Sequence, residues 1–213
     1  MSDDDLLKNR DYTLIIARNL ASRSEEHPWH QEWIEAQASI IDLAKKCQEF
    51  SLNGLTLYEA SGFLKKYQQT TVEQLANLLQ TNNSESTNTV IQTDINLVEA
   101  IADALSHYFQ RKAAGETQPK GEIIVVILDQ HGIDGIGELQ KLIVKATTMM
   151  EKNEELGITF IQIGDDAITR QFLIGLDDRL TQVGAKFDMV DTKYWHEISR
   201  RSIIQFLFDA ILD

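Results

Sequence analysis

The feature that most constrains the fold is an unbroken apolar run near the middle of the chain. Every residue from Ile123 to Leu128 is isoleucine, valine or leucine, and the acidic residues Glu122 and Asp129 bound the run. β-Branched residues favour strands, and a strand without polar alternation is buried on both faces. We therefore predict that residues 122–129 form a central strand of a mostly parallel sheet.

Other segments alternate between strand and helix patterns on either side of this run. The remaining predicted strands are short runs at 12–16, 55–60, 157–164 and 186–190, with a short edge strand at 63–67. The predicted helices carry apolar residues at helical spacing and lie at 33–49, 71–79, 97–109, 139–153, 166–180 and 197–212, with Asp94 as the N-cap of the third. This alternation predicts an α/β fold, a doubly wound and mostly parallel six-stranded sheet with helices on both faces.

The length of the chain suits a single domain. It has 213 residues, enough for one sizeable hydrophobic core, and no Pro/Gly-rich linker divides it. We expect residues 1–10 to form an N-terminal extension and residues 11–213 to form the domain. The segment 81–93 is rich in Asn, Ser and Thr, which predicts a mobile loop.

The chain is acidic, with 33 Asp and Glu residues against 20 Lys and Arg residues and a formal charge of -13. This balance argues against nucleic acid or an anionic membrane as the main partner, because both attract basic surfaces. The acidity either serves solubility alone or recognises a basic partner. We expect a cytoplasmic protein, because the N-terminus lacks an apolar signal core and no apolar run is long enough to span a membrane. The single cysteine, Cys47, excludes an intrachain disulfide and is expected in the core.

The predicted topology places the candidate site at one edge of the sheet. In a doubly wound sheet, ligands bind beyond the carboxyl ends of the strands, near the point where the strand order reverses. Four loops are expected to reach this edge: those after Ile16, after Ala60, before Asn96 and after Leu128. They contain residues 17–24, 93–95 and 129–135.

Two sequence motifs near these loops are weak evidence for a ligand site. Three glycines between residues 132 and 137 have the spacing G-x-x-G-x-G, and a dinucleotide site needs G-x-G-x-x-G, so a flexible loop is the better interpretation. His27 and His30 have no nearby cysteine and are separated by proline and tryptophan, so we interpret them as part of a surface loop rather than a zinc site. His107 and His196 lie in helical patterns and are interpreted as packing or surface residues.

The order of the predicted elements and several local strings resemble the von Willebrand factor A (vWA) family. More closely, it looks like the bacterial cytosolic branch of this family, including cyanobacterial proteins of about this length. The strings that carry it lie at 9–16, 33–50, 108–115, 154–164 and 183–188. The likeness covers nearly the whole chain, and it implies a vWA-type sheet and a site at its carboxyl edge.

The resemblance also implies a metal-ion-dependent adhesion site, which this family builds from three loops. The first loop carries D-x-S-x-S, and the matching positions here are Ala17, Asn19 and Ala21. The second loop supplies a threonine, which is replaced here by Ile95, and the third supplies an aspartate, which is retained as Asp129. Mg²⁺ prefers an oxygen shell that includes charged ligands. We therefore expect a degenerate site that binds no metal, and no other cofactor.

The leading hypothesis is a non-enzymatic protein–protein interaction module with a decayed, metal-free adhesion site. Its contacts would come from loop side chains, and the candidates are Asn19, Ser22, Trp29, His30, Asp94, Asp129, Gln130 and His131. Trp33 is expected to pack beneath its own helix. One alternative is a Mg²⁺-dependent binding domain in which Ser22 or Asp94 supplies a substitute oxygen. A second alternative is an enzyme that uses Asp129 and His131 as an acid/base pair in the same crevice. The sequence names no particular partner.

Overall fold

The computed structural model describes residues 7–51, 53–84, 95–129 and 135–198 and contains one six-stranded sheet. The strand order is β3-β2-β1-β4-β5-β6, and only β3 runs antiparallel to its neighbour. The strands are β1 (Asp11–Arg18), β2 (Leu55–Glu59), β3 (Lys65–Thr70), β4 (Glu122–Asp129), β5 (Leu156–Gln162) and β6 (Val190–Tyr194). The predicted α/β fold with a mostly parallel sheet is confirmed.

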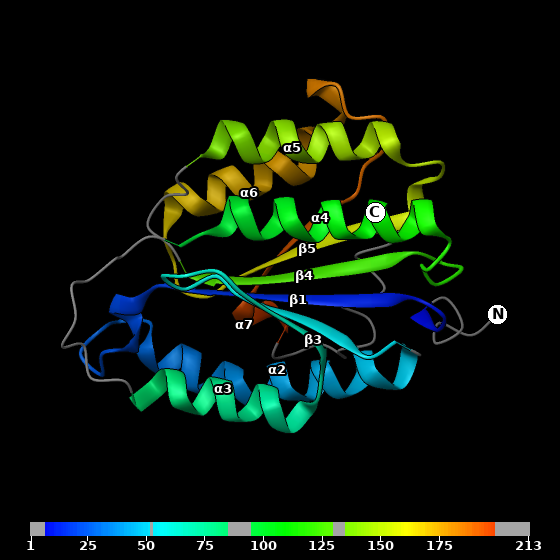
Figure 1. The fold of residues 1–213 in the computed structure, drawn as a ribbon. Helices are drawn as coiled ribbons and strands as arrows, with labels where there is room; N and C mark the ends of the chain where they lie inside the picture. Colours follow the sequence, from blue (N-terminus) through cyan, green and yellow to red (C-terminus); the bar gives the residue numbers. More distant parts are fainter. Residues whose placement is uncertain (1–6, 52, 85–94, 130–134, 199–213) are drawn as a thin grey trace.

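Helices cover both faces of the sheet (Figure 1). One face packs against α2 (His30–Phe50) and α3 (Val72–Ser84), and the short α7 (Trp195–Ile198) adds Trp195 to the same core cluster. The other face packs against α4 (Leu97–Ala114), α5 (Ile136–Met149) and α6 (Ala167–Arg179). Short 3-10 turns lie at Leu20–Arg23, Asn153–Glu155 and Thr181–Val183. None of the helices within the described ranges is long and apolar enough to cross a membrane.

Strand β4 is central, as its apolar run predicts. All of its residues are buried, and successive side chains alternate between the two core clusters. Ile123, Val125 and Ile127 join the cluster under α2 and α3, while the residues between them join the cluster under α4, α5 and α6. Full burial of each such side chain contributes about 1.5–3 kcal/mol, so the run is a major contribution to the stability of the core.

Four predicted boundaries are wrong at the periphery. The last strand is β6 (Val190–Tyr194) rather than 186–190, and the edge strand is β3 (Lys65–Thr70) rather than 63–67. Both are edge strands, and their polar residues lack the apolar pattern that marks a buried strand. The helix expected at 139–153 is Ile136–Met149, and residues 81–84 of the predicted loop 81–93 belong to α3. The rest of that loop lies outside the described residues, as does the predicted 197–212 helix beyond Ile198.

The start of the chain is not wholly separate from the domain. Leu7 is fully buried in the α2 cluster, and its carbonyl oxygen accepts a hydrogen bond from the Tyr12 hydroxyl at 2.7 Å. Arg10 is also buried and donates to the carbonyl oxygens of Lys120 and Glu154. The predicted extension 1–10 therefore contributes residues 7–10 to the domain.

Candidate functional site

Strands β1 and β4 meet at the point where the strand order reverses. From β1 the strand order continues outward to β2 and β3, and from β4 it continues outward to β5 and β6. In sheets of this kind, ligands bind beyond the carboxyl ends of the two strands at this reversal. At this carboxyl edge Arg18 and Asp129, the last residues of the two strands, are register partners. Partners in parallel strands point to the same face, which here is the face covered by α2.

Asp129 is fully buried, and both of its carboxylate oxygens accept hydrogen bonds from the protein. Oδ1 accepts the backbone N–H of Asn19 at 2.5 Å, and Oδ2 accepts the indole N–H of Trp33 at 2.5 Å. Trp33 reaches this position from the first turns of α2, where it is fully buried, as predicted. The carboxylate is therefore enclosed by the loop after β1 and by α2.

Arg18 lies beside this carboxylate and is 2% exposed. Its Nη2 donates to the carbonyl oxygen of Ser22 at 2.8 Å, and its Nε donates to the Ser22 hydroxyl at 3.3 Å. Its guanidinium carbon lies 5.2 Å from the centre of the Trp33 ring, within the range of a cation–π contact. Arg18 thus ties the end of β1 to the 3-10 turn that follows it.

Burial shifts the ionisation of both groups. It raises the pKa of Asp129 to about 7, although the hydrogen bonds from Ser22, Asn19 and Trp33 and the charge of Arg18 act in the opposite direction. It lowers the pKa of Arg18 to about 10, which the neighbouring Asp129 partly offsets. The guanidinium is therefore charged at neutral pH, while the Asp129 carboxyl titrates close to neutrality.

The β2–β3 loop forms the adjoining part of the same edge. The Ser61 hydroxyl accepts the backbone N–H of Arg18 at 3.1 Å. The Ala60 N–H donates to the Ile16 carbonyl, and the Ala60 carbonyl accepts the N–H of Asn96. The Asn96 side chain donates to the Gly62 carbonyl instead of capping α4, which begins one residue later. Asn96, not the predicted Asp94, therefore occupies the N-cap position. This fixed loop carries Phe63, whose side chain is 73% exposed.

A tryptophan and a glycine define the other side of the edge. The ring of Trp29 lies so close to Gly164 that a Cβ at that position would sit 2.4 Å from the indole. Its Nε1 donates to Asp165 at 3.2 Å, and Glu32 accepts the backbone N–H of Gly164 at 2.7 Å. Trp29 is 5% exposed, so the expectation that it forms an exposed aromatic anchor is wrong. The indole instead fastens the start of α2 to the loop after β5.

The predicted contact residues divide into three groups. Ser22, Trp29 and Asp129 are buried, and a partner would not touch them in this conformation. Asn19 and His30 are partly exposed, so their role in binding stays a prediction. Asp94, Gln130 and His131 lie outside the described residues. Sequence reasoning missed Arg18 and Phe63 as site residues. The available signal for Phe63 is its place in the loop after Ala60, which is expected at this edge, whereas Arg18 lies beyond the predicted strand 12–16.

The degenerate metal positions also have distinct environments. Ala17 is fully buried against the α4 side of the core, and Ala21 is exposed. Ile95 forms a β-bridge with Ser61, and the Asn19 side-chain oxygen accepts the backbone N–H of Ala21 at 2.8 Å. Over the described ranges no group of three or more His, Cys, Asp or Glu residues is placed to hold a metal ion.

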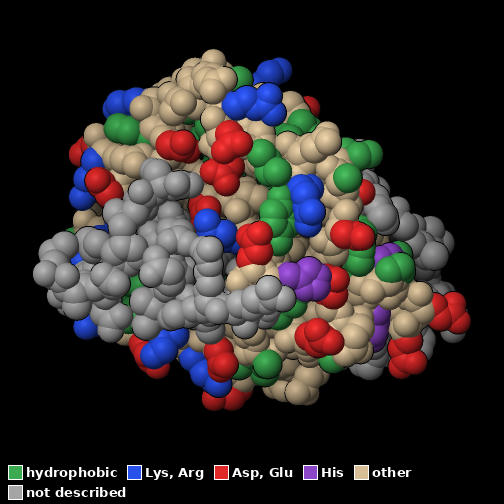
Figure 2. Space-filling model, turned by 180° about the vertical axis from the view of Figure 1, so that it is seen from behind, with side chains coloured by type: hydrophobic (Ala, Val, Ile, Leu, Met, Phe, Trp, Pro, Cys, Tyr) green, Lys and Arg blue, Asp and Glu red, His purple; other side chains and the backbone are tan. Residues whose placement is uncertain are grey.

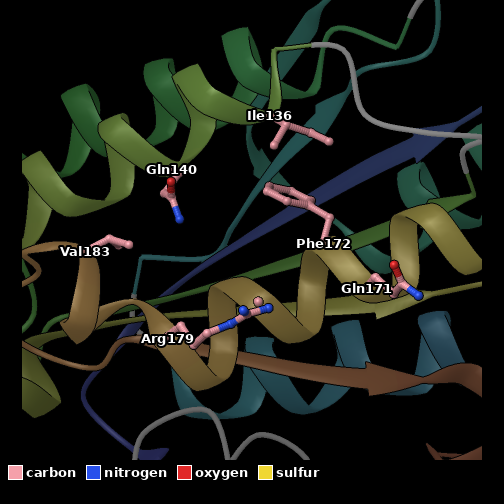
Figure 3. Close-up of a pocket in the computed structure, with 7 residues that line it drawn as sticks. Ile136, Gln140, Gln171, Phe172, Arg179 and Val183 are labelled. Atoms are coloured by element: carbon pink, nitrogen blue, oxygen red, sulfur yellow. The ribbon is translucent and has the colours of Figure 1, made fainter.

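A groove of about 260 Å³ lies between α5 and α6. Figure 3 shows Phe172, Gln140 and Val183 facing the space between the two helices. The remaining lining residues are Ile136, Gln171, Gly175 and Arg179. Cofactor and metabolite pockets usually enclose about 300–1,000 Å³, so this groove suits one or two side chains rather than a cofactor.

Comparison with solved structures shows which known proteins share this fold. Manganese-loaded TRAP protein from Plasmodium vivax superposes with a TM-score of 0.56 at 10% identity, over 94% of this chain and 74% of that one. The fold is of the von Willebrand factor A type. Proximal thread matrix protein 1 from the mussel byssus superposes with a TM-score of 0.51 at 13% identity, over 95% of this chain but only 48% of the mussel protein. No family model matches the sequence, and no curated protein matches it.

Proposed function

We propose that this chain is a non-enzymatic protein-interaction module that binds its partner without a divalent metal. The observation that carries the proposal is the state of Asp129, whose two carboxylate oxygens already accept hydrogen bonds from Asn19 and Trp33. A carboxylate that is enclosed in this way neither presents a free oxygen to a cation nor reaches a partner protein.

The remaining donors at this edge support the same proposal. Mg²⁺ and Mn²⁺ favour several oxygen ligands, including charged ones. Ala17, Ala21 and Ile95 offer no side-chain oxygen, and the Asn19 amide oxygen is engaged by the Ala21 backbone N–H. The residues described at this edge therefore do not fit a hard divalent ion.

A metal-free module needs another means of holding a partner, and Phe63 is the best candidate. It is the most exposed of the large apolar side chains in the described ranges. The hydrogen bonds of Ala60, Ser61 and Gly62 fix its loop, so binding would cost little ordering entropy. Exposed aromatic residues on rigid supports often dominate the energetics of interfaces. We assign Phe63 as the anchor of the binding surface, in place of Trp29.

The charge distribution favours a protein partner over nucleic acid. The chain carries a formal charge of -13. On the face shown in Figure 2, Asp and Glu side chains are interspersed with Lys and Arg rather than gathered in one patch. Phosphate binding depends on a cluster of basic side chains, and this face does not present one.

Affinity capture from native cytosol, repeated in Mg²⁺ and in EDTA, tests the proposal. We expect the same partner to be retained in both buffers, and we expect Phe63→Ser to release it. Met149→Ser is the matched control, because Met149 is 49% exposed and ends α5, which leads into the amino end of β5 on the opposite edge of the sheet. Capture that EDTA abolishes would support the Mg²⁺-dependent alternative. Equal loss with both serine variants would remove Phe63 as the anchor.

A further inference from the structure

The groove between α5 and α6 has an apolar end and a cationic end. Ile136 of α5 and Phe172 of α6 line the first, and Arg179 and Val183 line the second. Figure 3 shows the Phe172 ring pointing from α6 toward Ile136. Ile168 lies one helical turn before Phe172 on the same face of α6 and is 66% exposed. It therefore extends the apolar end of the groove with surface that is open to a partner.

A glycine in the middle of α6 keeps this groove open. Gly175 lies between Phe172 and Arg179 on the face of α6 that lines the groove. Glycine is among the least favourable residues inside a helix. A Cβ at this position would have only Arg179 atoms as its three nearest neighbours, with Nη2 at 3.3 Å. Packing against the rest of the chain therefore does not require glycine here, and its missing side chain leaves a notch beside the guanidinium.

Arg179 supplies a positive charge that the described residues do not neutralise. Within the described ranges its exposed side chain forms no hydrogen bond and no ion pair. None of the residues that line the groove is acidic, although the whole chain has a formal charge of -13, and the adjacent Asp178 is not part of the lining. A groove that combines an unpaired cation with apolar surface is complementary to a carboxylate beside an apolar side chain.

We propose that this groove docks an amphipathic helix of a partner protein that carries a large apolar side chain and a carboxylate one helical turn apart. The guanidinium lies against Gly175, three residues after Phe172, so the charge and the apolar end are separated by about 4.5 Å along α6. Residues one turn apart on a partner helix have a similar spacing and share one face. A helix packs readily into the groove between two others, and about 260 Å³ accommodates these two side chains. This surface is separate from Phe63, and the inference does not rest on the function proposed above.

Selection from a phage library of alanine-based helical peptides, randomised along one face, tests the proposal on the full chain. We expect the enriched peptides to carry a large apolar residue with Asp or Glu one turn away. Arg179→Gln should weaken the best peptide about fivefold, the strength of an exposed charge pair. Arg179→Glu should bind the version of that peptide in which lysine replaces the acid. Gly175→Gln should fill the notch and weaken binding, yet raise the melting temperature by about 2–4 °C, because it removes a glycine from the helix.

The matched control is Arg170→Gln, because Arg170 lies on the opposite side of α6, 4.0 Å from the centre of the Tyr194 ring. This variant should bind the selected peptide as the parent does. Enriched peptides without an acidic residue, or equal affinity for the parent and Arg179→Gln, would overturn the proposal. Failure to enrich any peptide on the parent over the Gly175→Gln variant would do the same. Phe63→Ser should leave peptide binding intact, so a failure here is distinguishable from a failure of the proposed function.

Discussion

The two ends of β4 each bury a carboxylate beside an arginine, but the two arginines connect different parts of the fold. At the amino end, Arg111 projects from α4 and pairs with Glu122 of β4 and with Asp11 of β1, the latter at 2.6 Å. At the carboxyl end, Arg18 belongs to β1 itself and contacts Ser22 in the turn that follows. The amino-end network fastens a helix to the sheet. The carboxyl-end network fastens the loop where this fold type places its ligands.

The hydrogen bonds of the two carboxylates reflect the same contrast. Glu122 accepts the Thr13 hydroxyl at 2.5 Å from the adjacent strand, in addition to its ion pair with Arg111. Asp129 accepts an indole N–H from α2 and a backbone N–H from its neighbouring loop. The comparison indicates that ion pairs join a helix to the sheet at the amino end. At the carboxyl end the two groups are held by separate contacts, Arg18 by Ser22 and Asp129 by Asn19 and Trp33.

The largest loss in the free energy of unfolding is expected from Arg111→Ala. The substitution leaves Glu122 and Asp11 as buried carboxylates without their shared cation, and removing one partner of a buried ion pair costs about 3–5 kcal/mol. Urea denaturation measures the loss. Lys112→Ala is the control, because Lys112 pairs with Glu155 and the exposed Glu151 at the more accessible surface of α4. An equal loss in both variants would contradict a structural role that is specific to the amino-end network.

A smaller effect is expected from Trp33→Phe, which keeps an aromatic ring beneath α2 but removes the donor to Asp129. A hydrogen bond to a charged buried group contributes about 1.5–3 kcal/mol, and we expect a loss of this order in denaturant midpoints. Trp29→Phe is the control, since its partner Asp165 is exposed and water can replace the lost donor. If Trp29→Phe lowers stability as much as Trp33→Phe or more, then the packing of the indole ring, and not its hydrogen bond to Asp129, accounts for the loss in Trp33→Phe.

The pH dependence of stability tests the buried carboxyl groups at both ends of β4, Glu122 and Asp129. Burial raises the pKa of Glu122 and of Asp129 to about 7, so each carboxyl binds its proton more tightly in the folded state. The stability that each contributes is fully present below the unfolded pKa of about 4 and is lost as pH rises through about 7. Asp129→Asn should flatten the decline between these values by at most about 1.4 kcal/mol per pH unit, and Glu122→Gln should act similarly. Asp42→Asn, an exposed-site control, should leave the slope unchanged, and an unaltered slope in Asp129→Asn would refute the expectation.

The smallest effect on stability is expected from Phe63→Ser. The side chain is 73% exposed, and substitutions at such positions usually change the free energy of unfolding by about 0.5 kcal/mol or less. Calorimetric melting of this variant beside Met149→Ser, at a second exposed apolar position, checks the expectation. A loss of several kcal/mol would mean that Phe63 packs into the loop, and it would no longer qualify as a free binding anchor.

The sequence predicts the sheet better than the site, for a physical reason. A buried central strand must be apolar on both faces, so the run from Ile123 to Leu128 marks β4 correctly. Strand β6 was predicted at 186–190, where Phe187 is apolar, whereas the edge of the sheet accommodates the polar residues Thr192 and Lys193. An edge strand with polar residues has no apolar pattern in the sequence, so its position cannot be predicted from the propensities of single residues.

The site depends on contacts between residues far apart in the chain. Position 129 is recognisable as the acidic end of a strand, but Asn19 and Trp33 donate to it from distant parts of the chain, and periodicity does not reveal them. An arginine at the end of β1 also gives no local sign that it is 2% exposed. Only the parallel register, which places Arg18 opposite Asp129, brings the pair together.

The most direct test of the central claim, that internal donors and not a metal occupy Asp129, is thermal melting of the unaltered chain with and without millimolar Mg²⁺ or Mn²⁺. The account predicts no shift in the parent. It predicts a gain of metal-dependent stability in a variant that combines Ala17→Asp, Asn19→Ser, Ala21→Ser and Ile95→Thr. An ion present at 100 times its dissociation constant would add about 2.7 kcal/mol, a shift of a few degrees. A metal-dependent rise in the parent that Asp129→Ala abolishes would contradict the account.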